Sequence, residues 1–349
     1  MKAKILITGA AGEIGSELAK ALANSRSAAE IILLDLKPSK YELPAGVRFV
    51  TRDILDTDFL ASLFEENDFE IIFHLAAILS SSGERDPMLA HRVNVEGSLN
   101  MLKLASEFGA RRGEAVKFIF PSTIAVYGLS PEEFLLKITE ELALSPITMY
   151  GVNKLYVEHL GRYFEAHYGG MPRLANSGVD IKKDGGLRDL SKRTVDFRSV
   201  RFPGILSAFT LPTGGTSDYA PEMIHAAARG ESYTCFVSHE TVLPFMAMPD
   251  AVGALLKLAA ADKTSLSRVV YNVNSFSISA GEIEELLREH FDSLQVSYKP
   301  DLARQAIVNS WPKFLDDSLA RREWGWRPDF NLEKTFMNYL IPNIKKYYK

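Results

Sequence analysis

The chain has 349 residues, of which 46% are hydrophobic and 24% are charged, and its formal net charge is −4. This is the composition of a folded globular protein, without the basic excess that a dedicated nucleic-acid binder needs to neutralise phosphates. The only cysteine, Cys235, excludes a disulfide within this sequence and a cysteine cluster for zinc. We therefore expect small-molecule chemistry in a reducing compartment, with no metal and no nucleic-acid partner.

The first predicted strand covers residues 3–8 and is followed at once by glycines and by an amphipathic helix over 13–23. Its apolar run is too short for a signal peptide or a membrane span, so we expect a cytoplasmic protein with no membrane partner.

Three glycines follow one another at spacings of three within residues 8–15, between this strand and this helix. Gly9 allows a tight turn, Gly12 allows the backbone to approach a pyrophosphate, and the third glycine allows close packing of helix on strand. Amides at the start of the helix, where Glu13 and Ile14 lie, then bind the phosphates. The segment therefore predicts a dinucleotide site.

Asp35 ends the second predicted strand, 20 positions after Gly15, where a carboxylate can accept hydrogen bonds from both ribose hydroxyls. It would repel the 2′-phosphate of NADP, and the neighbouring Leu36 carries no charge, so NAD is the predicted cofactor. Asp53 and Ile54, after the third strand, predict contacts with the amine and the ring of adenine. A helix cap is the alternative role for Asp53.

The fourth predicted strand ends in His74, Leu75, Ala76 and Ala77. The last three are predicted to line the cofactor, because the backbone must pass beside it there. We expect His74 to be a packed strand residue rather than a catalyst.

Tyr150 and Lys154 lie four residues apart in a predicted helix over 148–167, so they share one face of it. A nearby ammonium should stabilise the phenolate and lower the pKa of the tyrosine, which could then act as a general base. Thr123 ends the fifth strand, where a hydroxyl can meet a substrate oxygen. This combination predicts catalysis rather than a solvated helix pair.

The predicted elements form an α/β fold, a Rossmann-type doubly wound parallel sheet with a smaller α+β C-terminal substrate cap. We expect residues 1–200 to form the NAD-binding domain, with a surface insertion at 169–195. Residues 201–349 should be mainly the cap, with some segments returning to the first domain. The expected strands and helices cover residues 3–8, 13–23, 31–36, 47–51, 70–75, 90–108, 117–121, 148–167, 197–202, 219–229, 249–261, 280–290 and 316–324.

These motifs together resemble the extended branch of the short-chain dehydrogenase/reductase superfamily, which includes NAD-dependent sugar-nucleotide epimerases and dehydratases. The resemblance covers nearly the whole chain. It implies that Thr123 is the active-site hydroxyl, Tyr150 the base and Lys154 its partner, with Tyr150 and Lys154 also at the cofactor. It further implies that Asn94 and Pro203 contact the cofactor.

Four later blocks resemble the metal-independent, short-chain family of L-threonine 3-dehydrogenases, and they cover residues 201–207, 214–220, 243–251 and 304–318. This resemblance implies oxidation by NAD of a small substrate, L-threonine or a related 3-hydroxy amino acid. It implies Ser80, Thr216 and Trp311 at the substrate, together with Thr123 and Tyr150; for Ser80, Thr216 and Trp311 a packing role is an equal alternative.

Two other functions stay open from the sequence. A sugar-nucleotide epimerase or dehydratase would use the same Thr/Tyr/Lys set to oxidise a sugar hydroxyl. A binding protein could keep the NAD site without turnover, although it would not need all three residues.

The insertion at 169–195 directly follows the helix that carries Tyr150 and Lys154, and in this superfamily that helix pairs with its twin across a dimer. If the insertion folds over this face, it replaces the surface that a second subunit would bury. A loop that projects into solvent would leave the face open. We expect a monomer over the homodimer that is usual for the superfamily.

Overall fold

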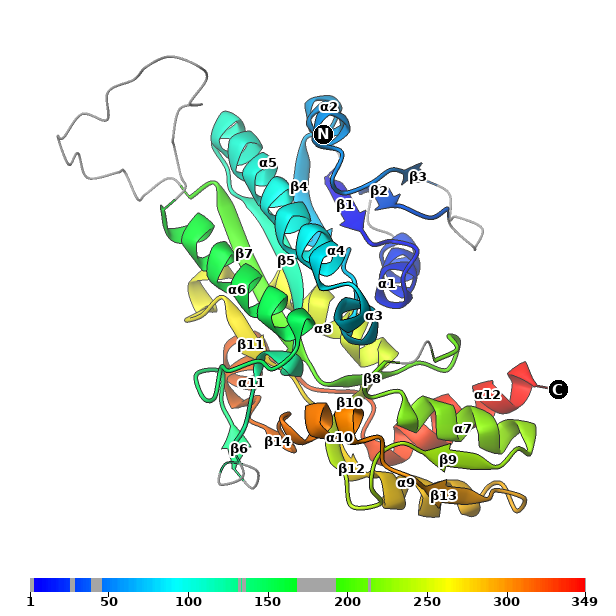
Figure 1. Cartoon of the computed structure of the whole chain (residues 1–349). Helices are drawn as coiled ribbons and strands as arrows, with labels where there is room; N and C mark the ends of the chain where they lie inside the picture. The colour runs from blue at the N-terminus through cyan, green and yellow to red at the C-terminus, as the bar shows by residue number, and fades with distance from the viewer. Residues whose placement is uncertain are drawn as a thin grey trace.

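The computed structural model of the chain describes residues 3–25, 29–38, 46–130, 133, 136–167, 193–212 and 215–348. Its centre is a parallel seven-stranded sheet with the strand order β3-β2-β1-β4-β5-β7-β11 (Figure 1). The strands are β1 (Lys4–Thr8), β2 (Glu30–Asp35), β3 (Val47–Thr51), β4 (Phe69–His74), β5 (Val116–Thr123), β7 (Val195–Phe202) and β11 (Val270–Asn272). The order reverses direction between β1 and β4, which confirms the predicted doubly wound sheet.

Helices cover both faces of the sheet because successive residues of the buried strands point to opposite sides. Ile5 and Ile7 of β1 belong to one core with helices on that face, whereas Leu6 belongs to the other core. Figure 1 shows α5 and α6 side by side over one face. The covering helices are α1 (Glu13–Asn24) and α8 (Met248–Ala260) on one face, and α2 (Thr57–Glu66), α5 (Gly97–Arg112) and α6 (Met149–His167) on the other.

Most of the remaining elements form the smaller α+β part, as predicted, which contains three small sheets: β12-β10-β8, β13-β9 and β14-β6. Its strands are β6 (Lys137–Ile138), β8 (Gly204–Leu206), β9 (Tyr233–Cys235), β10 (Val242–Ala247), β12 (Phe276–Ser279), β13 (Val296–Tyr298) and β14 (Phe314–Leu315). Its helices are α7 (Tyr219–Arg229), α9 (Ala280–Arg288), α10 (Leu302–Asn309), α11 (Ser318–Trp324) and α12 (Ile341–Tyr347), with the short helices η4 (Lys263–Ser265) and η5 (Lys334–Leu340). The predicted division at residue 200 stays a prediction.

The observed bounds agree with those expected to within about two residues, apart from one helix. The helix expected over 90–108 is a longer run of α4 (Pro87–His91), the π-helical turn η1 (Arg92–Glu96) and α5, because Asp86 caps its start and Gly113, in a left-handed conformation, ends it. Val195 already belongs to β7, and the rest of the expected insertion up to residue 192 lies outside the described residues. The same strand ends at Phe202 as expected, and a separate strand, β8, begins at Gly204 in another sheet.

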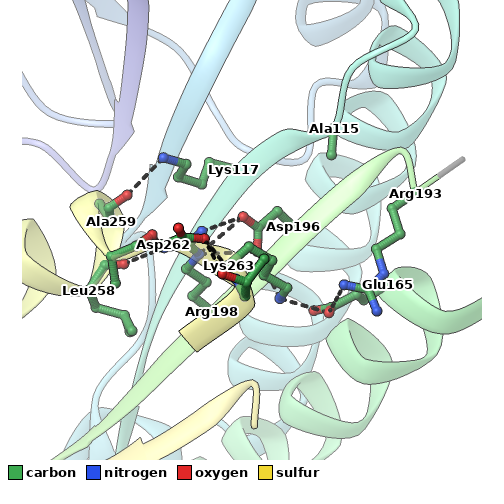
Figure 2. Close-up of polar contacts among 12 residues, drawn as sticks. Ala115, Lys117, Glu165, Arg193, Asp196, Arg198, Leu258, Ala259, Asp262 and Lys263 are labelled. Atoms are coloured by element: carbon green, nitrogen blue, oxygen red, sulfur yellow. Dashed lines mark hydrogen bonds and ion pairs between the residues drawn. The ribbon is translucent and has the colours of Figure 1, made fainter. Parts of the chain in front are cut away.

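A cluster of buried charges joins the starting end of β7 to two helices (Figure 2). Arg198 donates to both oxygens of Asp196 over 2.6 to 3.1 Å, and its Nη1 donates to two carbonyls at the end of α8 over 2.6 and 2.7 Å. Lys263 bridges Asp196 at 2.9 Å and Glu165 of α6 at 2.7 Å. The cluster therefore holds the ends of α6 and α8 against the sheet. In the part of the chain that the structure describes, no helix is long and apolar enough to span a membrane.

Arg198→Ala should lower the free energy of unfolding by about 3 kcal/mol or more, because it leaves the Asp196 carboxylate buried beside fewer donors. Urea unfolding followed by circular dichroism measures this loss. Arg229→Ala is the matched control: Arg229 pairs with Glu231 on the surface, and its loss should cost at most about 1 kcal/mol. Equal losses in the two variants would contradict the structural role of the cluster.

Candidate active site

The loop between β1 and α1 (residues 9–12) passes so close to neighbouring backbone that side chains would collide at two of the three glycines of the motif. Gly9 has a φ of 68°, and a Cβ on it would lie 2.5 Å from the backbone nitrogen of Ala76. A Cβ on Gly15 would lie 2.4 Å from the Gly9 carbonyl oxygen. Gly12 is the N-cap of α1 and offers no side chain to the first amides of the helix, where Glu13 and Ile14 lie. Those amides are therefore left to bind an anion.

Asp35 stands beside this loop at the end of β2. Its Oδ2 accepts from the Ala11 backbone nitrogen at 2.9 Å, and its Oδ1 accepts from that of Lys37 at 3.0 Å. A carboxylate can accept about four hydrogen bonds, so these two leave capacity for ribose hydroxyls. Leu36 next to it is exposed, as a residue over an adenosine could be. The glycine loop, the uncapped helix start and Asp35 together fit NAD.

Asp53 does not cap the following helix, so the alternative role considered for it is wrong. Asp56 is the N-cap of α2 and accepts from the Phe59 backbone nitrogen, whereas Asp53 accepts from that of Leu55 at 2.9 Å. Ile54 is only 6% exposed and packs in the core under α5. The contacts of Asp53 and Ile54 with adenine stay predictions.

His74 is a packed strand residue, as expected. Its ring nitrogens share hydrogen bonds with Thr8 Oγ1 at 2.8 Å and Ser98 Oγ at 2.9 Å. Complete burial, with a smaller contribution from the charge of Lys154, lowers the pKa of His74 to about 3. The same Thr8 oxygen accepts from the Ala76 backbone nitrogen, so these groups fix the start of the segment Leu75 to Ala77.

Asn94 holds the protein backbone with its own amide. Its Oδ1 accepts from the Ile78 nitrogen at 2.7 Å, and its Nδ2 donates to the Ile78 oxygen at 3.0 Å. Asn94 lies in η1 and is buried, so these two bonds fix the chain directly after Ala77. Pro203, the other cofactor contact that the resemblance implies, is buried between β7 and β8. Both contacts stay predictions.

The structure brings the three predicted catalytic residues together. Thr123 is the last residue of β5, and its side chain lies close enough to that of Tyr150, near the start of α6, to act on the pKa of the phenol. Lys154 Nζ lies 5.6 Å from the centre of the Tyr150 ring and donates to the Pro121 carbonyl at 2.8 Å. The two hydroxyls and the amine thus meet at the carboxyl end of the sheet, where ligands bind in this class of fold.

The expected lowering of the Tyr150 pKa is wrong for the protein alone. Burial raises the pKa of this phenol, and the nearby Thr123 side chain offsets only part of the effect. Burial also lowers the pKa of Lys154 to about 7, while the carboxylate of Glu158 acts in the opposite direction. Desolvation disfavours the charged form of both groups. This effect depends on burial in the folded chain, and the four-residue spacing of Tyr150 and Lys154 in the sequence gives no information about burial.

The residues predicted at the substrate are only partly brought together. Thr216 Oγ1 donates to Ser80 Oγ at 3.2 Å, although the two lie far apart in the sequence. Ser80 begins α3 (Ser80–Arg85), and Glu84 of the same helix accepts from the Met149 backbone nitrogen at 2.7 Å at the start of α6. The sequence analysis missed this link. Trp311 is 6% exposed and packs in the core, so its place at the substrate stays a prediction.

Among the described residues, no group of three or more histidine, cysteine, aspartate or glutamate side chains could hold a metal ion.

The profile of the NAD dependent epimerase/dehydratase family matches residues 5–274. The chain belongs to this family. Its membership confirms the resemblance seen in the sequence and the predicted cofactor, NAD.

Individual relatives within and beyond this family differ in how similar they are to the chain. The mitochondrial L-threonine 3-dehydrogenase of Bos taurus is 35% identical over 342 residues, covering 96% of this chain and 82% of the relative. The solved structure of a monomeric L-threonine 3-dehydrogenase from a metagenome has a TM-score of 0.83 and 36% identity, covering 99% of this chain and 100% of that one. UDP-glucose 4-epimerase of Thermotoga maritima has a TM-score of 0.78 over 99% of this chain and 100% of its own, but only 23% identity, which is a likeness of fold alone.

Asp35→Ala should weaken the binding of NAD by roughly tenfold or more, because the ribose hydroxyls lose a charged acceptor. It should also reduce the preference for NAD over NADP, since the carboxylate that repels the 2′-phosphate is gone. Isothermal titration calorimetry with both cofactors measures the two affinities. Asp262→Ala removes an exposed carboxylate that binds its own turn and should change neither Kd. An unchanged ratio of the NAD and NADP affinities in Asp35→Ala would count against the ribose contact.

Proposed function

We propose that the chain is an NAD-dependent L-threonine 3-dehydrogenase, which oxidises the β-hydroxyl of L-threonine to give 2-amino-3-oxobutyrate and NADH. The observation that carries the proposal is that Thr123, at the end of β5, lies near Tyr150 of α6, with the Lys154 amine 5.6 Å from the centre of the Tyr150 ring. A dehydrogenase needs such a hydroxyl pair to orient an alcohol and remove its proton. The similarity to the Bos taurus and metagenome proteins supports threonine as the substrate.

The reaction assigns a separate task to each of the three residues. The substrate hydroxyl hydrogen-bonds Thr123 and Tyr150, and the Tyr150 phenolate takes its proton as the carbonyl forms. Lys154, held by the Pro121 carbonyl, supports the phenolate with its charge. NAD, which the glycine loop and Asp35 would hold, would supply the acceptor for the hydride of the substrate Cβ and a positively charged ring that would favour the phenolate.

The substrate end of the site is proposed at the contact between Ser80 and Thr216. Both carry hydroxyls that suit the ammonium and carboxylate of an amino acid, and Thr216 is almost fully buried. Two small hydroxyl residues suit a compact 3-hydroxy amino acid, L-threonine or a related one. Trp311 is proposed as an apolar wall beside the same substrate.

The activity would place the chain in threonine catabolism. Its location is a separate matter: the Bos taurus relative is named as mitochondrial. We propose the cytoplasm as the location, because the apolar run at residues 3–8 is too short for a signal peptide or a membrane span.

Tyr150→Phe should lower kcat by about a hundredfold to ten-thousandfold, because it removes the proton acceptor. The Kd for NAD should change little, since only one hydroxyl is lost. NADH absorbance with L-threonine and NAD gives kcat, and calorimetry gives the Kd. Tyr156→Phe on the exposed side of the same helix is the control and should keep full activity.

Retention of more than about a tenth of kcat in Tyr150→Phe would remove this residue from the role of general base. A wild-type protein that gives no NADH from threonine but turns over a UDP-sugar would overturn the proposed function in favour of an epimerase.

We propose further that the chain is a monomer. The metagenome relative is described as monomeric, and the expected insertion directly follows α6 in the sequence, which supports the proposal. The outer side of α6 exposes Val152, Tyr156 and Tyr163, which marks the face that a second subunit would cover.

Light scattering across a dilution series should therefore give a mass near 38.8 kDa at every concentration. Deletion of residues 169–192 should raise the mass toward that of a dimer if the insertion is the cause. A wild-type mass of twice the monomer that persists on dilution would contradict the proposal.

A further inference from the structure

Glu158 and Arg201 form a completely buried ion pair next to the catalytic residues. Their side chains are 1% and 0% exposed. Arg201 donates from Nη2 to Glu158 Oε2 at 2.6 Å and from Nε to Oε1 at 2.9 Å. The hydroxyl of Ser122 donates to the same Oε1 at 2.5 Å. Three donors from two strands therefore converge on one carboxylate of α6.

This carboxylate fixes the distance between α6 and the end of β5. Glu158 lies four residues after Lys154, one helical turn further along the same face. Ser122 stands between Pro121, whose carbonyl accepts from Lys154, and Thr123, the catalytic hydroxyl. Neighbouring strand residues point to opposite faces of the sheet. The hydrogen bond from Ser122 to Glu158 therefore also fixes the backbone from which the Thr123 side chain projects.

The arginine extends the same network to the neighbouring segments. Arg201 Nη1 donates to Tyr127 Oη at 2.9 Å and to the Glu140 carbonyl at 2.7 Å. Tyr127 in turn donates to Asn272 Oδ1 of β11 at 2.8 Å. The network thus reaches from the catalytic helix across β5 and β7 to the edge of the sheet.

A stability role alone does not require an ion pair at this place. Removing two charges from water is costly, and a well-packed apolar pair of similar volume would hold the elements together as well. An apolar pair cannot place a negative charge one turn from Lys154.

The groups around Lys154 show that the negative charge of Glu158 favours the protonated form of the lysine. On its own helix Lys154 faces Glu158 and Tyr150, and on β4 it faces His74, which is neutral because burial holds its pKa at about 3. Arg201 on β7 is already paired with the carboxylate. Burial lowers the pKa of Lys154 to about 7, and among these groups Glu158 is the one whose charge opposes that effect.

We propose that Glu158 is a positioning residue for the oxidation, one that anchors the strand end bearing Thr123 through Ser122 and keeps Lys154 protonated through its charge. The kinetic part of this inference rests on the proposed function. The ionisation of Lys154 does not, because it can be followed without any substrate.

The test is Glu158→Gln, which keeps the shape of the side chain and removes its charge. NMR of protein with isotopically labelled lysine side chains follows the ionisation of Lys154, with Lys154→Arg to assign its signal. Loss of a nearby opposite charge should make Lys154 release its proton at a pH lower by roughly one unit. With threonine and NAD, kcat near neutral pH should fall about tenfold or more, while the KM for NAD stays close to that of the wild type.

Glu284→Gln is the matched control. Glu284 is also buried, and it also accepts two bonds from an arginine, Arg288, and one from a hydroxyl, Tyr298, but it lies on α9 in the cap. This variant should leave both the ionisation of Lys154 and kcat unchanged.

Ser122→Ala separates anchoring from charge, and it removes so little that it should fold even if Glu158→Gln does not. It should lower kcat severalfold and leave the ionisation of Lys154 as in the wild type. The proposal is overturned if Lys154 titrates at the same pH in Glu158→Gln and in the wild type, or if Ser122→Ala keeps full kcat. A wild-type protein inactive on threonine would overturn the proposed function instead, and the NMR titration would still decide the role of the charge.

Discussion

The close approach of two chain segments at the carboxyl edge of the sheet is the constraint on which the site depends. The position of Gly9 leaves no room for a side chain, because the backbone of Ala76 lies directly against it. His74 strengthens this approach by binding Thr8 on the neighbouring strand and Ser98 on the helix behind. The glycine loop, the end of β2 and the end of β4 are therefore held around one opening at the reversal of the strand order. The residues predicted to hold the cofactor are therefore brought to one place by this contact between Gly9 and Ala76.

Local patterns made most of this predictable. Short apolar runs separated by helical periodicity define the parallel sheet, and the bounds of α7 follow directly from its apolar spacing. The meeting of the three residues proposed to be catalytic was also predictable, since Thr123 ends a strand and Tyr150 and Lys154 share one helical face. These inferences need only neighbours in the sequence, and the fold then places strand ends at one edge of the sheet.

Contacts between distant segments were not predictable in this way. Nothing in the spacing of Glu158 and Arg201 shows that they meet in the core. The direction of the Tyr150 pKa was missed for a related reason, because it depends on how deeply the phenol is buried. The pairing of Ser80 with Thr216 was reached only through resemblance to a family, and no local pattern in either segment indicates it.

The seventh strand has a consequence for how the chain is made. β11 pairs with β7, and α8 packs on α1 near the opposite end of the sequence, so one edge and one face of the sheet are completed only by residues from 248 onward. During synthesis, an emerging chain of the first two hundred residues would expose the apolar side of α1 and an unpaired edge on β7. Assembly of the nucleotide-binding part is therefore a late event on the ribosome. Truncation within the cap should endanger the sheet as much as the cap itself.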